Sequence, residues 1–148
     1  MKTIKKNVYY CDFCNKKGLS ASHISIHEKH CTANPKRICR TCEANPDIDS
    51  YIQELKKRFE IIETPLLPCD QYDMIEGAIE RTIKWIGEPI KLNEILNHVE
   101  NCPNCTLAIL RLTKLNYNIF GFNFNYKKAL DEWWGEINNE RENAERYY

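Results

Sequence analysis

Residues 11–42 read CDFCNKKGLSASHISIHEKHCTANPKRICRTC, and this stretch decides the fold because it carries five of the eight cysteines in the 148-residue chain. Cys11 and Cys14 form a Cys-x-x-Cys pair, and His27 and Cys31 follow after a spacer of twelve residues. A helix places His27 and Cys31, four positions apart, on one face. Two thiolates on a turn and two ligands one helical turn apart can converge tetrahedrally on Zn²⁺. The stretch therefore predicts a small module that a metal ion stabilises.

The cysteines are expected to be free thiols in a reducing compartment. The N-terminus is basic but no apolar stretch follows it, and the apolar runs elsewhere are too short for a transmembrane helix. We therefore expect a cytoplasmic protein without membrane contact, in which paired thiols are metal ligands rather than disulfides. His30 is the competing fourth ligand of the first set. It lies only three residues from His27, so Cys31 is preferred.

Segment 9–31 resembles a zinc finger of the C2H2 family in its Cys-Cys-His-Cys form. Tyr9 is the aromatic residue two positions before the first cysteine, and Ile24 is the apolar residue three positions before the first helical ligand. Gly18 departs from the family, which usually has an aromatic residue there, and Leu19 is next to it. The resemblance implies two strands and a helix around zinc. It covers about a sixth of the chain.

The charge of the chain is divided unevenly. Residues 1–42 hold nine Lys or Arg and two Asp or Glu, a net charge of +7, and residues 43–148 carry −7. A basic segment suits the phosphates of nucleic acid. The resemblance places base-contacting positions at Ser20, His23 and Ile26, of which Ile26 can make only apolar contact. The candidate nucleic-acid contacts are Lys5, Lys6, Lys16, Lys17, His23, Lys36 and Arg37.

Two further pairs, Cys39/Cys42 and Cys102/Cys105, can form a second zinc site with four thiolate ligands. The later pair opens an expected helix, whose N-terminus stabilises thiolate. A knuckle pair with a pair that opens a helix resembles the treble-clef arrangement of many zinc modules. The 59 residues between the pairs exceed the roughly 15–20 of a compact ribbon, so the helices between them must return the chain to the site. We expect two Zn²⁺ per chain.

Other interpretations of these cysteines stay open. The segment 102–105 is similar to a thioredoxin-type dithiol, although the residues before it look helical rather than extended. His98 and Glu100 are similar to zinc-deaminase elements, which however sit on a separate helix from their cysteines. HNH nucleases also have paired cysteines but need several histidines. Cys69 is unpaired and is expected to be a loop or core thiol, or a substitute ligand. No catalytic constellation emerges, so a non-enzymatic protein is expected.

The fold class expected is mainly α with small β content, α+β. A ββα finger of the C2HC type should occupy residues 1–35, and a mainly helical body with the four-cysteine site should occupy residues 36–148. Strand character is predicted at 9–10, a turn at Gly18 and a strand over 119–124. Helices are predicted over 21–31, from Asn45-Pro46 to about 62, over 71–86, over 91–100, from Pro103 through 115, and over 126–145.

Trp133 and Trp134 lie on the last of these helices. Adjacent residues point about 100° apart on a helix, so one of the two rings must leave the apolar face. That ring is a candidate anchor for a protein interface. The phenylalanines at 120, 122 and 124 are instead expected in the core, since no Arg or Lys alternates with them.

These features predict a zinc-binding regulatory protein that contacts nucleic acid through its basic finger. The alternative is a protein-interaction module or inhibitor that acts through the finger or the acidic helical face. An abundance of Ile, Asn and Lys is typical of AT-rich genomes, which suits a low-GC bacterium or its phage.

Overall fold

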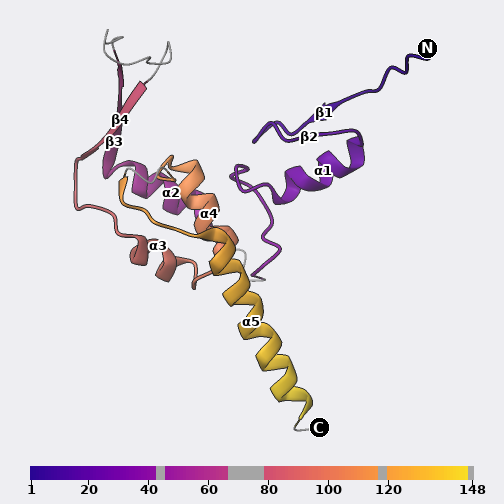
Figure 1. The fold of residues 1–148 in the computed structure, drawn as a ribbon. Helices are drawn as coiled ribbons and strands as arrows, with labels where there is room; N and C mark the ends of the chain where they lie inside the picture. The colour runs from indigo at the N-terminus through magenta and orange to yellow at the C-terminus, as the bar shows by residue number, and fades with distance from the viewer. Residues whose placement is uncertain (43–45, 67–78, 117–119, 147–148) are drawn as a thin grey trace, which may run out of the picture.

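The computed structural model describes residues 1–42, 46–66, 79–116 and 120–146. These residues form five helices and two small antiparallel sheets (Figure 1). The chain is therefore a small α+β protein, which confirms the predicted class at this level. Among the described helices, none is both long and apolar enough to cross a membrane.

The N-terminal elements are two short strands and a helix. β1 (Tyr9–Tyr10) pairs antiparallel with β2 (Lys17–Gly18), and α1 (Ala21–His30) follows. The Ser20 side chain caps α1 by accepting a hydrogen bond from the backbone N–H of His23, which satisfies one of the free donors of the first turn.

The packing between β2 and α1 is close. Gly18 lies in β2 rather than in a turn, so that prediction is wrong. A Cβ atom at Gly18 would lie 3.0 Å from Cδ1 of Ile24, which is closer than side chains normally pack. Ile24 is buried together with Cys11 and Cys31 in a small separate core. The absence of a side chain at Gly18 thus allows the helix to approach the strand closely.

The main core lies among three helices: α2 (Ile48–Lys56), α3 (Leu92–His98) and α4 (Pro103–Leu112). The fully buried aliphatic side chains of this core are Ile52, Leu55, Ile95, Ile109, Leu110 and Leu115. The fifth helix, α5 (Tyr126–Glu145), packs against α4 and then extends away from the other helices (Figure 1).

A β-hairpin projects from the other end of the body (Figure 1). β3 (Phe59–Pro65) pairs antiparallel with β4 (Ile79–Trp85), with Phe59 opposite Trp85 and Ile61 opposite Ile83. Opposed residues of an antiparallel pair share a face of the ribbon. These four side chains pack on the main core, and the Phe59 and Trp85 rings meet edge to face with centroids 6.0 Å apart.

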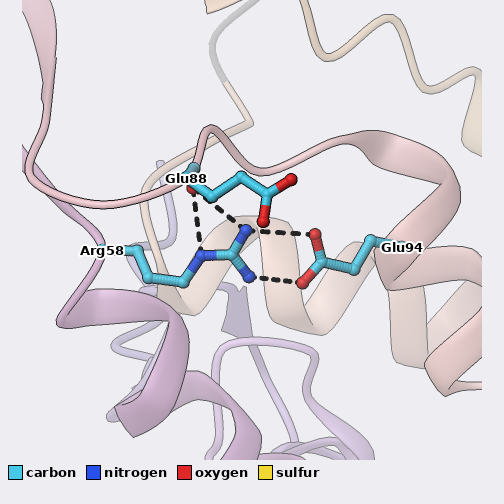
Figure 2. Close-up of polar contacts among 3 residues, drawn as sticks. All are labelled: Arg58, Glu88 and Glu94. Atoms are coloured by element: carbon cyan, nitrogen blue, oxygen red, sulfur yellow. Dashed lines mark hydrogen bonds and ion pairs between the residues drawn. The ribbon is translucent and has the colours of Figure 1, made fainter.

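Arg58 connects both ends of this hairpin to α3. The Arg58 guanidinium donates to both carboxylate oxygens of Glu94 in α3 (Figure 2). It also donates to the carbonyl oxygen of Glu88, at 3.1 Å from Nε and 3.0 Å from Nη2. Arg58 precedes β3 and Glu88 follows β4, so one side chain joins both ends of the hairpin to α3. A bidentate pair with additional acceptors is a strong form of this interaction.

The helix predicted from Asn45-Pro46 to about residue 62 is wrong in both bounds. Asp47 is the N-cap of α2, and its carboxylate accepts from the backbone N–H groups of Asp49 and Ser50. The helix ends at Lys56, and residues 59–65 form β3 instead. β-Branched residues at 61, 62 and 64 suit a strand.

The helix predicted over 71–86 is also wrong where it can be compared, because residues 79–85 form β4. Its first part, 71–78, lies outside the described residues. The strand predicted over 119–124 is wrong for its described part, since residues 120–124 contain no strand. The expectation that its phenylalanines are core residues is confirmed: Phe122 is buried, and Phe120 and Phe124 pack against the core.

Candidate metal centres

The first four-ligand set converges at the N-terminal elements. Cys11 and Cys14 lie on the turn between β1 and β2, and His27 comes from the last turns of α1, which Cys31 follows directly. The four ligand atoms lie within 4.8 Å of one another. The Cys14 Sγ and His27 Nε2 atoms are 3.2 Å apart. Tetrahedral zinc with bonds of about 2.3 Å to sulfur and about 2.0 Å to nitrogen would separate such atoms by about 3.5 Å, so the set fits zinc closely.

His30 is engaged elsewhere. Its Nδ1 atom lies 2.8 Å from the carbonyl oxygen of Ile38, to which it donates. The group that could hold a metal ion contains Cys31 instead, as the sequence spacing predicts.

The turn at the first pair is shaped by the backbone. The N–H of Cys11 donates to the carbonyl oxygen of Lys16 at 2.9 Å, and the N–H of Asn15 donates to the carbonyl oxygen of Cys11 at 3.0 Å. Asn15 has a φ of 58°, in the left-handed region that asparagine tolerates better than most residues. This turn brings the Cys14 thiol back toward α1.

The ligands of the first set differ in their readiness to ionise. Burial raises the pKa of Cys14, but the N–H of Lys16 and the neighbouring thiols outweigh it and lower the pKa. Burial raises the pKa of Cys31 to about 11. Burial, with the nearby charges of Lys16 and Arg40, lowers the pKa of His27. The imidazole is therefore held in the neutral form that binds a metal ion.

The second set joins segments that are distant in sequence. Cys39 Sγ lies 3.7 Å from Cys102 Sγ, and Cys42 Sγ lies 3.6 Å from Cys105 Sγ. All four sulfur atoms lie within 4.8 Å of one another, and none is in a disulfide. Zinc bonds of about 2.3 Å in a tetrahedron place sulfur atoms about 3.8 Å apart. The two pairs thus have the separation that a four-thiolate zinc site requires.

Residues inside the two Cys-x-x-Cys motifs hold the pairs together. The Asn104 side chain donates through Nδ2 to the Thr41 hydroxyl. The Tyr126 hydroxyl, at the start of α5, donates to Oδ1 of Asn104 at 2.7 Å. The backbone N–H groups of Thr41 and Cys42 point at Cys39 Sγ, each at 3.4 Å. Sequence reasoning missed Thr41, Asn104 and Tyr126. The only sequence signal of Thr41 and Asn104 is that each is a polar residue at the third position of a Cys-x-x-Cys motif, and Tyr126 has none.

The thiols of the second set compete for protons. Hydrogen bonds from Cys102 and Cys105 lower the pKa of Cys39 well below its usual range. A hydrogen bond with Cys105 lowers the pKa of Cys102. A hydrogen bond with Cys39, together with burial, has the larger opposite effect, so the pKa of Cys102 is raised to about 12. The Cys105 pKa is raised by its bonds to Cys102 and Cys39. Four adjacent thiols cannot all ionise unless a cation compensates their charge.

A half-buried arginine, Arg37, lies near this set. The Nε and Nη2 atoms of Arg37 are buried and make no hydrogen bond within the described residues. The guanidinium charge acts on Cys105, whose pKa it lowers. A buried cation needs a counter-charge. Four thiolates around a divalent ion carry a net charge of −2 and would supply one, so the residues present fit a zinc ion here.

The other predicted site residues are placed as follows. Lys5, Lys6, Lys16, Lys17, Lys36 and His23 are exposed. Arg37 is half-buried, with its Nε and Nη2 atoms buried, and its contact with nucleic acid stays a prediction. Trp133 packs partly against the main core, whereas Trp134 is 43% exposed. Cys69 lies outside the described residues.

No protein-family model, curated protein or solved structure matches the chain. The function of the two clusters is therefore argued from their own geometry.

Proposed function

We propose that the protein is a non-enzymatic, zinc-binding regulatory protein that contacts nucleic acid through its basic N-terminal segment, residues 1–35. The observation that carries the proposal is the pair of four-ligand clusters, one built into that segment and one directly after it. The order β1, β2, α1, with ligands on the turn and at the helix end, supports a finger of the C2H2 type in its Cys-Cys-His-Cys form.

The metal ions have a structural role in this proposal. Four protein ligands complete a tetrahedron, and a closed tetrahedral site has no position for a water or substrate. The first ion would bind a segment too small to be stable through its apolar core, since the first cluster buries only one aliphatic residue, Ile24. The second ion would join residues 39–42 to residues 102–105 at the main core. The same closure argues against a zinc hydrolase and supports the non-enzymatic assignment.

Nucleic acid is the proposed partner because of the charge of the segment. Residues 1–42 carry a net charge of +7, and Lys16 and Lys17 are exposed beside the first cluster. Lysines that bind phosphates displace counterions, which drives association at low salt. Lys36 is also exposed, on the segment that joins the clusters, and adds a further positive charge.

The salt dependence of binding tests this proposal. Association of the full chain with labelled duplex and single-stranded oligonucleotides should weaken steeply with salt, with a log–log slope of roughly −0.9 per contacted phosphate for duplex and −0.7 for single strands. Replacing Lys16 and Lys17 with Ala should reduce the magnitude of the slope by about one per lost contact. Lys127→Ala with Lys128→Ala, two exposed lysines on α5, is the matched control and should leave the slope unchanged.

Absence of binding to duplex DNA, single-stranded DNA and RNA at low salt would contradict the proposal. A protein-interaction module would then take its place. One observation favours that alternative: Trp134, on α5, is 43% exposed. Exposed tryptophans are frequent energetic anchors of protein interfaces.

A further inference from the structure

The ribbon formed by β1 and β2 has one face that points away from α1. Tyr9 is opposite Gly18, and Tyr10 is opposite Lys17. Gly18 faces Ile24 of α1, since a Cβ at Gly18 would meet the Ile24 side chain. Successive residues of a strand point to opposite faces, and opposed residues share a face. The pair Tyr10 and Lys17 therefore lies on the outer face.

This outer face and the adjoining turn expose aromatic rings among lysines. Tyr10 is 58% exposed, and Phe13, on the Cys11–Cys14 turn, is 44% exposed. Lys16 and Lys17 follow the turn directly and are exposed. Rings left in water beside cations are the combination with which proteins bind single-stranded nucleic acid, because bases stack on the rings and phosphates meet the cations.

Both acidic side chains of residues 1–42, those of Asp12 and Glu28, belong to this turn or contact it. The Glu28 carboxylate accepts the backbone N–H of Asp12 at 3.0 Å, and this contact fixes the turn on α1. Residues 1–42 as a whole still carry a net charge of +7, which favours an anionic ligand.

The helix α1 is poorly equipped to read a duplex. Of the three positions that contact bases in the C2H2 family, the Ser20 hydroxyl caps the helix and is bonded to Ser22 at 2.9 Å. Ile26 is 47% exposed and offers no hydrogen bond. His23 alone remains for a base edge, whereas specific reading of the major groove rests on several polar contacts.

We infer that the ligand of the N-terminal segment is single-stranded nucleic acid, whose bases stack on Tyr10 and Phe13 while Lys16 and Lys17 hold the phosphates. The inference rests on the proposed function and names its ligand class. In a duplex the base faces are already stacked on each other and are not available to these rings.

Anisotropy measurements with the full chain test the inference. The probes are a short labelled oligothymidylate, an abasic strand of the same length and a duplex of the same length. The oligothymidylate should bind most tightly. Tyr10→Ala and Phe13→Ala should each weaken its binding by on the order of five- to a hundredfold. Both should leave binding to the abasic strand nearly unchanged, since that strand keeps only the phosphates.

Two further variants separate stacking from other effects. Tyr10→Phe keeps the ring and should retain the affinity of the native chain. Ile26→Ala removes an equally exposed apolar side chain from α1 and should have no effect. Zinc content and circular dichroism of every variant should match the native chain. The comparison of oligothymidylate with the abasic strand needs no variant, so it holds even where a substitution impairs folding.

The outcomes distinguish this inference from the proposed function. Equal or tighter binding to the duplex, with no loss on Tyr10→Ala and Phe13→Ala, would overturn the stacking inference and leave nucleic-acid binding intact. Equal binding to the oligothymidylate and the abasic strand would overturn it in the same way. Failure to bind any of the three probes at low salt would overturn the proposed function as well.

Discussion

The cysteine thiols of the two clusters have different pKa values, although they are the same chemical group. In the second cluster, hydrogen bonds from Cys102 and Cys105 lower the pKa of Cys39, so this thiol is the first to ionise. The Cys102 pKa is raised to about 12. In the first cluster, burial raises the pKa of Cys31 to about 11. Without a metal ion, several ligands therefore hold their protons at neutral pH.

Zinc loading of the metal-free protein at pH 7 should therefore release protons. Cys31, Cys102 and Cys105 have raised pKa values and are protonated there, whereas zinc binds the thiolate. A raised pKa means that the thiol form persists below about 11 to 12, so the release should shrink as the pH approaches that range. Calorimetric titrations in two buffers of different ionisation enthalpy measure it. Identical heats in both buffers at pH 7 would contradict the account.

Asn104 should be the most important residue of the second cluster that is not a ligand. It donates to Thr41 and accepts from Tyr126, so Asn104→Ala leaves both partners unpaired. We expect a loss of about 1–3 kcal/mol in the free energy of unfolding. Tyr126→Phe removes one hydroxyl and should cost about 0.5–1.5 kcal/mol. Urea unfolding followed by circular dichroism measures both. Equal losses, or none for Asn104→Ala, would refute this role.

The ligands were predictable from sequence, but the residues that support them were not. A cysteine or histidine at ligand spacing points to a metal whatever surrounds it, so both sets could be identified from spacing alone. The role of Asn104 depends on Thr41, which is distant in the chain and becomes its neighbour only when the fold brings the two pairs together. The packing of Arg37 was not predictable for a related reason, because its charge suggests a surface position and only the structure shows its Nε and Nη2 atoms buried.

Secondary-structure elements were predictable where the periodicity of apolar residues was unambiguous. Helices at α1, α3, α4 and α5 lie close to their predicted ranges, although α4 ends at Leu112 rather than at residue 115. The hairpin was missed because Ile79 and Ile83, four positions apart, share a face in a helix as well as in a strand. Pairing with β3 decided between them, and a contact between distant segments leaves no trace in the local pattern.

The helix α5 allows a matched comparison between adjacent tryptophans. Trp133 packs against the main core and Trp134 is exposed. Trp133→Ala should lower the free energy of unfolding by about 2–3 kcal/mol, below the full cost of a buried aromatic because Trp133 is only partly covered. Trp134→Ala should change it by less than about 0.5 kcal/mol. Denaturant unfolding followed by far-ultraviolet circular dichroism measures both. A large loss for Trp134→Ala would show that this ring is not free for a partner.

Across the whole molecule, the two clusters are joined by few contacts. The backbone N–H of Ile38 donates to the carbonyl oxygen of Lys29 at 2.8 Å, and Arg111 of α4 donates to the Thr32 hydroxyl at 2.7 Å. His30 adds its bond to Ile38. Exposed hydrogen bonds of this kind contribute about 1 kcal/mol each, so we expect them to orient the two parts without making one depend on the other for folding.

Loss of a ligand should therefore act locally. Cys14→Ser should unfold residues 9–31 and leave the helical body largely intact. Cys105→Ser should destabilise the body, because it breaks the joint between residues 39–42 and 102–105. Hydrogen exchange with peptide-level mass spectrometry distinguishes these patterns. Loss of protection in both parts after either substitution would contradict the independence of the two parts, 1–35 and 36–148.

Two zinc ions, one in each four-ligand cluster, are proposed to organise this chain. Native mass spectrometry of protein purified without added metal, followed by alkylation of the folded protein, tests this proposal. We expect two zinc ions per chain, with Cys39, Cys42, Cys102 and Cys105 protected from the alkylating reagent until the metal is chelated. A folded protein that holds one zinc ion or none, with Cys39 or Cys102 freely alkylated, would contradict it.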